Sequence, residues 1–259
     1  MLRSFASSWL DLLAPPQCAE CGKAQLRSPA SARPPTLCAA CHARIPRLAC
    51  ACFPGAIDPS APGCLACAGW GPALPRCRST VAYEAGSQAW MQRFKYPRPG
   101  PMGLDPAARR VVEDWVRAAV LRRPGPPPDA VVPVPLHPRR LRERGFNPAA
   151  LLARAAARQL GRPLASPTLL VRLRDTPSQT PLDREARMVN VAGAFRGDGP
   201  QKRGWETLLL VDDVATTGAT LVAAARALRL AGYRHVDAIC AARTPAQEEI
   251  KTRRRASSP

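Results

Sequence analysis

The stretch LLLVDDVATTGATL at residues 208–221 decides the fold class of this chain. Its first four residues form a continuous apolar run, which is typical of a parallel β-strand covered on both faces. Asp212 and Asp213 follow directly, at the end of the strand where open α/β sheets bind ligands. Small and hydroxyl-bearing residues come next, and apolar residues then recur at helical spacing as far as Leu228. The stretch therefore predicts a strand, a tight loop and a helix that belong to a mostly parallel α/β sheet.

The loop after the two acids has the chemistry of an anion site. Backbone N–H groups and the helix dipole attract negative charge at the start of a helix, and Gly218 lacks the side chain that would hold a phosphate away. The carboxylates of Asp212 and Asp213 suit vicinal hydroxyls and a divalent cation instead. These residues predict a sugar-phosphate site, with the acids on a ribose and the loop on its 5′-phosphate. The alternative is a plain strand–turn–helix with an acidic cap. The loop residues are Ala215, Thr216, Thr217, Gly218, Ala219 and Thr220.

A second group of basic residues follows the apolar strand predicted at residues 130–136. The prolines at 133 and 135 cannot donate to a strand ladder, so we expect the strand to become a loop there. Four arginines then occur within six positions, which favours binding of a strongly anionic group such as pyrophosphate. The alternative is a solvated charged face. These arginines are Arg139, Arg140, Arg142 and Arg144, and Asn147 after them is expected to cap a helix that ends at Leu160.

The composition of the chain is strongly basic. Lys and Arg number 38 against 19 Asp and Glu, which gives a net charge of +19, and 34 of the 38 are arginines. Such a charge favours nucleic acid or phosphorylated ligands. The chain is also rich in alanine and contains 30 prolines, so coding bias is the alternative explanation for part of the arginine excess.

The cysteines predict a metal site near the start of the chain. Nine of the ten cysteines fall between residues 18 and 77, and two Cys-x2-Cys pairs are separated by sixteen residues, which is the spacing of a four-cysteine zinc ribbon. Disulfides are the alternative, which the lack of a secretory signal disfavours. The four predicted ligands are Cys18, Cys21, Cys38 and Cys41. A second set, whose first pair has Cys-x-Cys spacing, is Cys50, Cys52, Cys64 and Cys67.

Several other segments can be assigned from their patterns. Residues 171–195 have no clean period but are rich in arginine, and we interpret them as a mobile lid over the phosphates, with a disordered loop as the alternative. No segment approaches the roughly 20 apolar residues of a membrane helix, which predicts no membrane insertion and a cytoplasmic protein. The remaining expected elements are an amphipathic helix at 1–14, a strand at 80–85, helices at 88–94 and 105–123, a strand at 235–242 and a basic, disordered tail at 244–259.

Taken together, these motifs resemble the ComF family, in which a small cysteine-rich zinc module precedes a type I phosphoribosyltransferase domain. The resemblance covers nearly the whole chain. Its motifs, in chain order, are the paired cysteines, Phe94-Lys95-Tyr96, Val132-Pro133-Val134-Pro135, Arg144-Gly145-Phe146-Asn147, residues 172–190 and residues 211–220. The sequence departs from the family pattern in the Cys50-x-Cys52 spacing and in Pro148 directly after Asn147.

The resemblance implies a fold, an activity and a set of site residues. The fold would be a zinc module at 1–77 followed by a phosphoribosyltransferase-type α/β domain at 78–243. The protein would bind phosphoribosyl pyrophosphate with Mg²⁺, transfer the phosphoribosyl group to an unidentified acceptor, and be linked to DNA uptake in natural competence. Asp212 and Asp213 would be catalytic, and the substrate would also contact the loop 215–220, Arg139, Arg140, Arg144, Lys95 and Arg172.

A non-catalytic protein is the alternative function. The same fold could hold a nucleotide or single-stranded DNA without turnover, as an accessory protein of DNA uptake, because a fold does not fix a function. Aromatic residues make up 5% of the chain, which weakens the case for a dedicated single-strand stacking surface.

Overall fold

The computed structural model describes residues 15–25, 36–48, 71–96, 103–123, 126–175, 191, 193–199 and 204–245. Four of the sequence predictions fall outside these ranges, wholly or in large part. They are the helix at 1–14, the second cysteine set, residues 176–190 of the predicted lid and residues 246–259 of the predicted tail.

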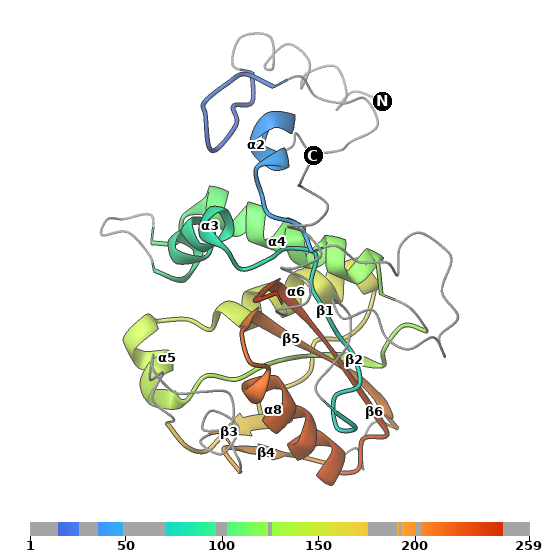
Figure 1. The fold of residues 1–259 in the computed structure, drawn as a ribbon. Helices are drawn as coiled ribbons and strands as arrows, with labels where there is room; N and C mark the ends of the chain where they lie inside the picture. Colours follow the sequence, from blue (N-terminus) through green and yellow to red (C-terminus); the bar gives the residue numbers. More distant parts are fainter. Residues whose placement is uncertain are drawn as a thin grey trace, which may run out of the picture.

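A parallel sheet forms the centre of the described structure (Figure 1). The strands pair in the order β1-β6-β5-β2, and every pairing among them is parallel. Their bounds are β1 Cys77–Arg78, β2 Ala130–Pro133, β5 Thr207–Ala215 and β6 His235–Arg243. A separate antiparallel pair consists of β3 Leu170–Arg172 and β4 Phe195–Gly197. The predicted α/β class with a parallel sheet is confirmed.

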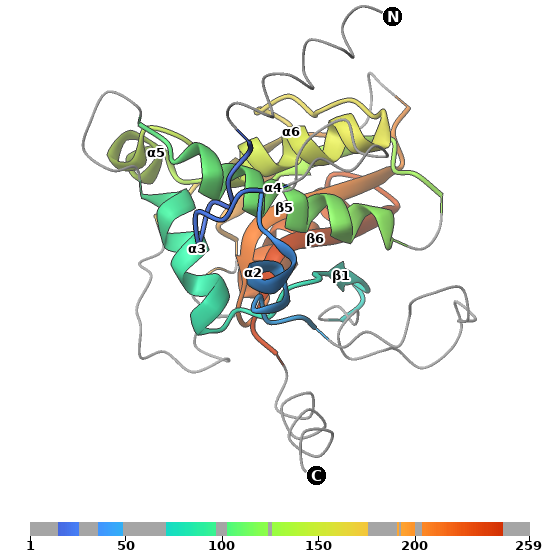
Figure 2. The same ribbon diagram turned by 90° about the horizontal axis from the view of Figure 1, so that it is seen from above.

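Helices cover both faces of this sheet (Figure 1). Helices α4 (Pro106–Leu121) and α6 (Pro148–Leu160) pack side by side on one face (Figure 2), and α8 (Ala219–Leu230) covers the other. Leu209 and Val211 of β5 belong to the core under α4 and α6, whereas Leu208 and Leu210 belong to the core under α8. Because neighbouring strand residues point to opposite faces, a strand covered on both sides is apolar throughout, as residues 208–211 are.

The cysteine-containing segment packs on the same core as α3 (Ala85–Lys95) and α4. Cys18, Leu37, Cys41 and Ile45 lie in one apolar cluster with the aromatic side chains of these helices. The segment also includes the short helix α2 (Ala39–Ala43), and its backbone joins the main fold where the Ala82 N–H donates to the Pro46 carbonyl at 2.9 Å. The division into domains at residue 78 stays a prediction.

The prediction of a strand at 80–85 is wrong in its bounds. The observed strand β1 ends at Arg78, and beyond it Val81 and Ala82 make only isolated bridges. Helix α3 begins at Ala85, three residues before the predicted start, because Glu84 and Ser87 form a reciprocal capping box. The Ser87 hydroxyl accepts from the Glu84 N–H at 3.0 Å, so the chain turns into a helix where an extended segment was expected.

The other predicted elements of the main fold occur close to their predicted positions. Asp105 caps α4 by accepting from the Ala107 and Ala108 N–H groups, and Asn147 caps α6 by accepting from the Ala149 N–H. The strand predicted at 130–136 ends earlier, at Pro133, and the strand predicted at 235–242 extends to Arg243. Within the described ranges, no helix has the length and the apolar character needed to cross a membrane.

Candidate active site and metal centre

The paired acids lie on β5, beyond the end of the neighbouring strand β2. Pro133, the last residue of β2, is in register with Val211, whereas β5 continues beside β6 as far as Ala215. The Val134 N–H donates to the Val211 carbonyl at 2.9 Å just after the end of β2. The sequence predicted a strand that stops before Asp212. The observed strand instead runs through both acids, and their β2 side is open because β2 has become a proline-containing loop.

Lys95 is the cation closest to the acid pair among the described ion pairs. Its Nζ lies 3.1 Å from Asp213 Oδ2, and the two side chains are 19% and 14% exposed, so water screens this pair less than a surface pair. Lys95 is the last residue of α3, 118 positions before Asp213 in the chain. The fold therefore brings the Phe94-Lys95-Tyr96 motif to the end of β5.

Asp212 is held in an environment that opposes its ionisation. Burial, followed by the negative charge of Asp213, raises the pKa of Asp212 to about 7. The Asp213 N–H donates to Asp212 Oδ1 at 2.8 Å, and Lys95 and Arg172 oppose the rise without cancelling it. A cation bound beside the pair would favour the ionised form, so these carboxylates have the chemistry of a site that receives a cationic group.

The predicted phosphate loop links the acids to α8. Gly218 adopts the left-handed conformation, with φ of 78°, and α8 begins at the next residue. The Thr217 hydroxyl accepts from the Ala219 N–H at 3.4 Å, and the Thr216 side chain is exposed. The first turn of α8 provides N–H groups at the same edge of the sheet as the acids, as the sequence predicted for an anion.

The predicted pyrophosphate loop at 139–144 is a helix instead. Helix α5 spans Pro138–Arg144, with His137 accepting the Arg139 N–H at 3.3 Å and Gly145 ending the helix at φ of 78°. Proline in the first turn and glycine after the last are standard helix boundaries, which explains why the arginines are not in a loop.

Asp175 connects α5 to the end of β3. Arg139 Nη1 lies 3.8 Å and Arg140 Nε 3.4 Å from its carboxylate, while Arg139 Nε donates to Glu143 at 2.9 Å. The Arg144 guanidinium lies 5.3 Å from the centre of the Tyr96 ring. The arginine-rich helix is thus tied both to β3 and to the motif that carries Lys95.

Arg172 lies between these groups. Burial lowers the pKa of its guanidinium, the negative charge of Asp212 raises it, and Arg140 lowers it further. The guanidinium lies 5.4 Å from the centre of the Phe195 ring. The structure therefore brings Lys95 and Arg172 near one acid pair, whereas Arg139 and Arg140 both face Asp175.

Four cysteines form the predicted metal cluster. The sulfur atoms of Cys18, Cys21, Cys38 and Cys41 all lie within 4.8 Å of one another. The Cys21 and Cys38 sulfurs are 3.7 Å apart, and tetrahedral ligands at the usual zinc–sulfur distance would be separated by about 3.8 Å. His42, a neighbour of this set in sequence, contacts Arg47 instead.

The protonation of these thiols also favours a bound cation. Burial opposes ionisation of Cys18, but backbone N–H groups lower its pKa to about 6, and the Cys38 N–H donates to its sulfur at 3.3 Å. Burial and the neighbouring thiols raise the pKa of Cys41 to about 12. Four thiolates at this separation require a positive charge among them, so the cluster can bind a metal such as zinc.

No protein-family model matches the chain. Curated relatives do match. The chain is 40% identical over 119 residues to the DNA utilization protein YhgH of Salmonella typhi, which covers 46% of this chain and 51% of that protein. It is 32% identical over 151 residues to Competence protein F of Haemophilus influenzae, which covers 56% of this chain and 63% of the relative. These matches support the assignment of the matched part of the chain to the ComF family. The chain spans between half and two thirds of the length of these relatives.

Among solved structures, this ComF homologue is similar to the crystal structure of adenine phosphoribosyltransferase from Leishmania tarentolae. The similarity covers 60% of this chain and 86% of that one, at 15% identity and a TM-score of 0.27. A TM-score this low supports no argument about fold or activity.

Sequence reasoning on this ComF homologue missed one residue of the site, Asp175. The feature of the sequence that could have indicated Asp175 is its position as an acid directly after Arg172 and Arg174, in an otherwise basic segment. The pairing of Asp175 with α5 crosses 35 residues of chain, so no local pattern could have predicted it.

Proposed function

We propose that this ComF homologue binds phosphoribosyl pyrophosphate with Mg²⁺ at the end of β5 and transfers the phosphoribosyl group to an acceptor. The observation that carries the proposal is the position of Asp212 and Asp213. They lie past the end of β2 and a short loop before α8, whose N-cap is the left-handed Gly218, and Lys95 contacts Asp213.

Each part of the substrate has a matching group in this arrangement. Asp212 and Asp213 would accept hydrogen bonds from the ribose hydroxyls, and the loop 215–220 would donate to the 5′-phosphate. The pyrophosphate would lie toward the cations. These are Lys95, Arg139, Arg140, Arg144 and Arg172, which belong to α3, α5 and β3.

The chemistry follows from these positions. A nitrogen of the acceptor forms a bond to the anomeric carbon of the ribose while the bond from that carbon to the pyrophosphate oxygen breaks and its electron pair leaves with pyrophosphate. Positive charge develops on the sugar, so the nearby carboxylates stabilise the transition state, and the basic residues stabilise the leaving group. Mg²⁺, bound together with the substrate, would neutralise part of the pyrophosphate charge.

The residues fit a bound cation. Burial and the charge of Asp213 together raise the pKa of Asp212 to about 7. A positive charge that arrives with the substrate would therefore favour ionisation of Asp212. We further propose that the four-cysteine cluster holds a structural zinc ion and that the protein is cytoplasmic.

A second candidate function is nucleotide or single-stranded DNA binding without turnover, as part of DNA uptake. The net charge of +19 favours it, as do the names of the relatives, which refer to DNA utilization and competence. The acid pair at the end of β5 favours a sugar ligand in either case.

Isothermal titration calorimetry with phosphoribosyl pyrophosphate and Mg²⁺ tests the proposal. We expect binding to the parent protein and loss of binding in the Asp212→Asn/Asp213→Asn variant, which should remain folded by circular dichroism. The exposed Asp198→Asn change serves as a control. Equal affinity in the double variant and the parent would remove the assignment, while binding without pyrophosphate release in the presence of a panel of purine and pyrimidine bases would favour the second candidate.

A further inference from the structure

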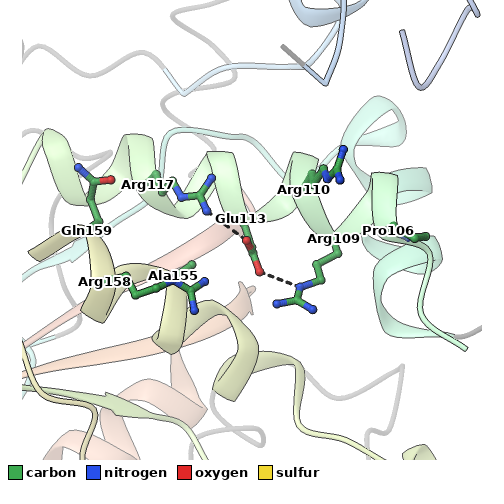
Figure 3. Close-up of a pocket in the computed structure, with 8 residues that line it drawn as sticks. All are labelled: Pro106, Arg109, Arg110, Glu113, Arg117, Ala155, Arg158 and Gln159. Carbon is green, nitrogen blue, oxygen red and sulfur yellow. Dashed lines mark hydrogen bonds and ion pairs between the residues drawn. The ribbon is translucent and has the colours of Figure 1, made fainter. Parts of the chain in front are cut away.

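A hollow between α4 and α6 lies apart from the candidate active site. Its volume is about 550 Å³ (Figure 3), and its lining residues all come from these two helices. None of the residues assigned above to the sugar, the phosphates or the metal cluster contributes to it. The lining residues are Pro106, Arg109, Arg110, Glu113, Arg117, Ala155, Arg158 and Gln159.

The charges in this hollow are unbalanced. Glu113 is 6% exposed and is its only acidic lining residue. Arg109 Nε donates to Glu113 Oε1 at 2.8 Å and Arg117 Nη2 to Oε2 at 3.2 Å, so one buried carboxylate orients two guanidinium groups. Figure 3 shows these three side chains meeting between the helices.

Two further arginines line the hollow without an acid of their own. Within the part of the chain that the structure describes, no carboxylate forms an ion pair with Arg110 or Arg158, whereas Asp114 adds a second partner for Arg117 at 2.7 Å. The lining thus contains four arginines and one glutamate, and two of these arginines, Arg110 and Arg158, have no described acid as an ion-pair partner. Such an arrangement attracts an anion with more than one charged group.

The lining also indicates what kind of anion fits. It contains no aromatic residue, and its apolar members are Pro106 and Ala155, so the hollow offers no aromatic ring on which a base could stack. Guanidinium groups bind phosphate oxygens through paired N–H donors, and several of them close together suit linked phosphates. We infer that the hollow between α4 and α6 is a second phosphate-binding site, which takes linked phosphate groups by charge and hydrogen bonding without reading a base.

The test compares two double variants with the same change of net charge. The variant of the hollow, called the groove variant, is Arg110→Gln/Arg158→Gln. The matched control is Arg196→Gln/Arg226→Gln, whose side chains are exposed on β4 and α8. Binding of tripolyphosphate, and separately of a single-stranded oligodeoxynucleotide, is measured by calorimetry on the full chain with zinc. We expect the groove variant to lose at least tenfold in affinity for one of these probes, because each lost contact is to a charged group, and the control to stay within about twofold of the parent.

The choice of probe identifies the source of the phosphates. A loss confined to tripolyphosphate assigns the site to free condensed phosphates, and a loss confined to the oligodeoxynucleotide assigns it to a nucleic-acid backbone. Equal losses in the groove and control variants would mean diffuse attraction to a basic protein and would overturn the inference, as would unchanged binding of both probes. The Asp212→Asn/Asp213→Asn variant should retain this binding, so failure at one site is distinguishable from failure at the other.

Discussion

Replacing Asp212 by Asn should stabilise the protein, and the gain should be larger at pH 8 than at pH 5. The pKa of Asp212 is raised from an ordinary value of 3.8 to about 7, mainly by burial and by the charge of Asp213. A carboxyl group whose pKa is raised by folding favours the folded state only while it is protonated. Its contribution is complete below about pH 4 and is lost as the pH rises to 7. Asn cannot ionise, so the variant avoids this loss.

The size of the expected stability difference follows from the part of the pKa shift that lies between pH 5 and pH 8. About two pH units separate pH 5 from the raised pKa, which corresponds to at most about 2.7 kcal/mol at about 1.36 kcal/mol per unit. Asp212 is half-buried rather than fully enclosed, and water screens part of this effect. We therefore expect the stability difference between variant and parent to grow by about 1–2 kcal/mol from pH 5 to pH 8.

Urea unfolding followed by circular dichroism at pH 5, 6, 7 and 8 measures this difference. Asp198→Asn, at an exposed position, should show a flat difference across the same range. A variant that is less stable than the parent at pH 8, or a difference that does not change with pH, would refute the reasoning. We expect the variant to gain stability and to lose ligand binding, because the two neighbouring carboxylates destabilise the fold but serve the function.

Three other outcomes follow from the site geometry. Asp175→Asn should tighten phosphoribosyl pyrophosphate binding about two- to fivefold in calorimetry. The Asp175 carboxylate forms ion pairs with Arg139 and Arg140 that compete with the ligand, and such partly exposed pairs contribute under about 1 kcal/mol each. Weaker binding by this variant would contradict the prediction. Arg139→Gln/Arg140→Gln should weaken binding of phosphoribosyl pyrophosphate far more than binding of ribose 5-phosphate. Equal weakening of both ligands would mean that these arginines form only a solvated charged face. Mass spectrometry of the native protein should find at least one zinc ion per chain. The Cys18→Ser variant should lose this ion and its cysteine segment should unfold, because a structural zinc site contributes on the order of 10 kcal/mol of apparent folding free energy. A parent protein that is compact but metal-free would contradict the zinc assignment.

Local patterns in the sequence determined the elements around the central strand. The apolar run at 208–211, the acids after it and the helical spacing to Leu228 predicted β5 and α8 because backbone sterics and two-sided burial act over a few residues. The cysteine spacing likewise predicted the four-cysteine cluster, since each Cys-x2-Cys pair places two sulfurs on one turn.

The tertiary structure alone decided which distant residues meet. Lys95 reaches Asp213 because α3 ends at the edge of the sheet where β5 outlasts β2, and Asp175 reaches α5 because β3 ends beside it. The sequence order of these residues does not determine such contacts, because they depend on the strand order β1-β6-β5-β2 and on its register. The segment 139–144 shows the same limit at short range. The prolines before it predicted a loop and its charges predicted an anion site there, but Pro138, Gly145 and the His137 cap make it a helix. Chain-local chemistry thus determined what each segment could be, and packing of segments far apart in the chain decided what each side chain faces.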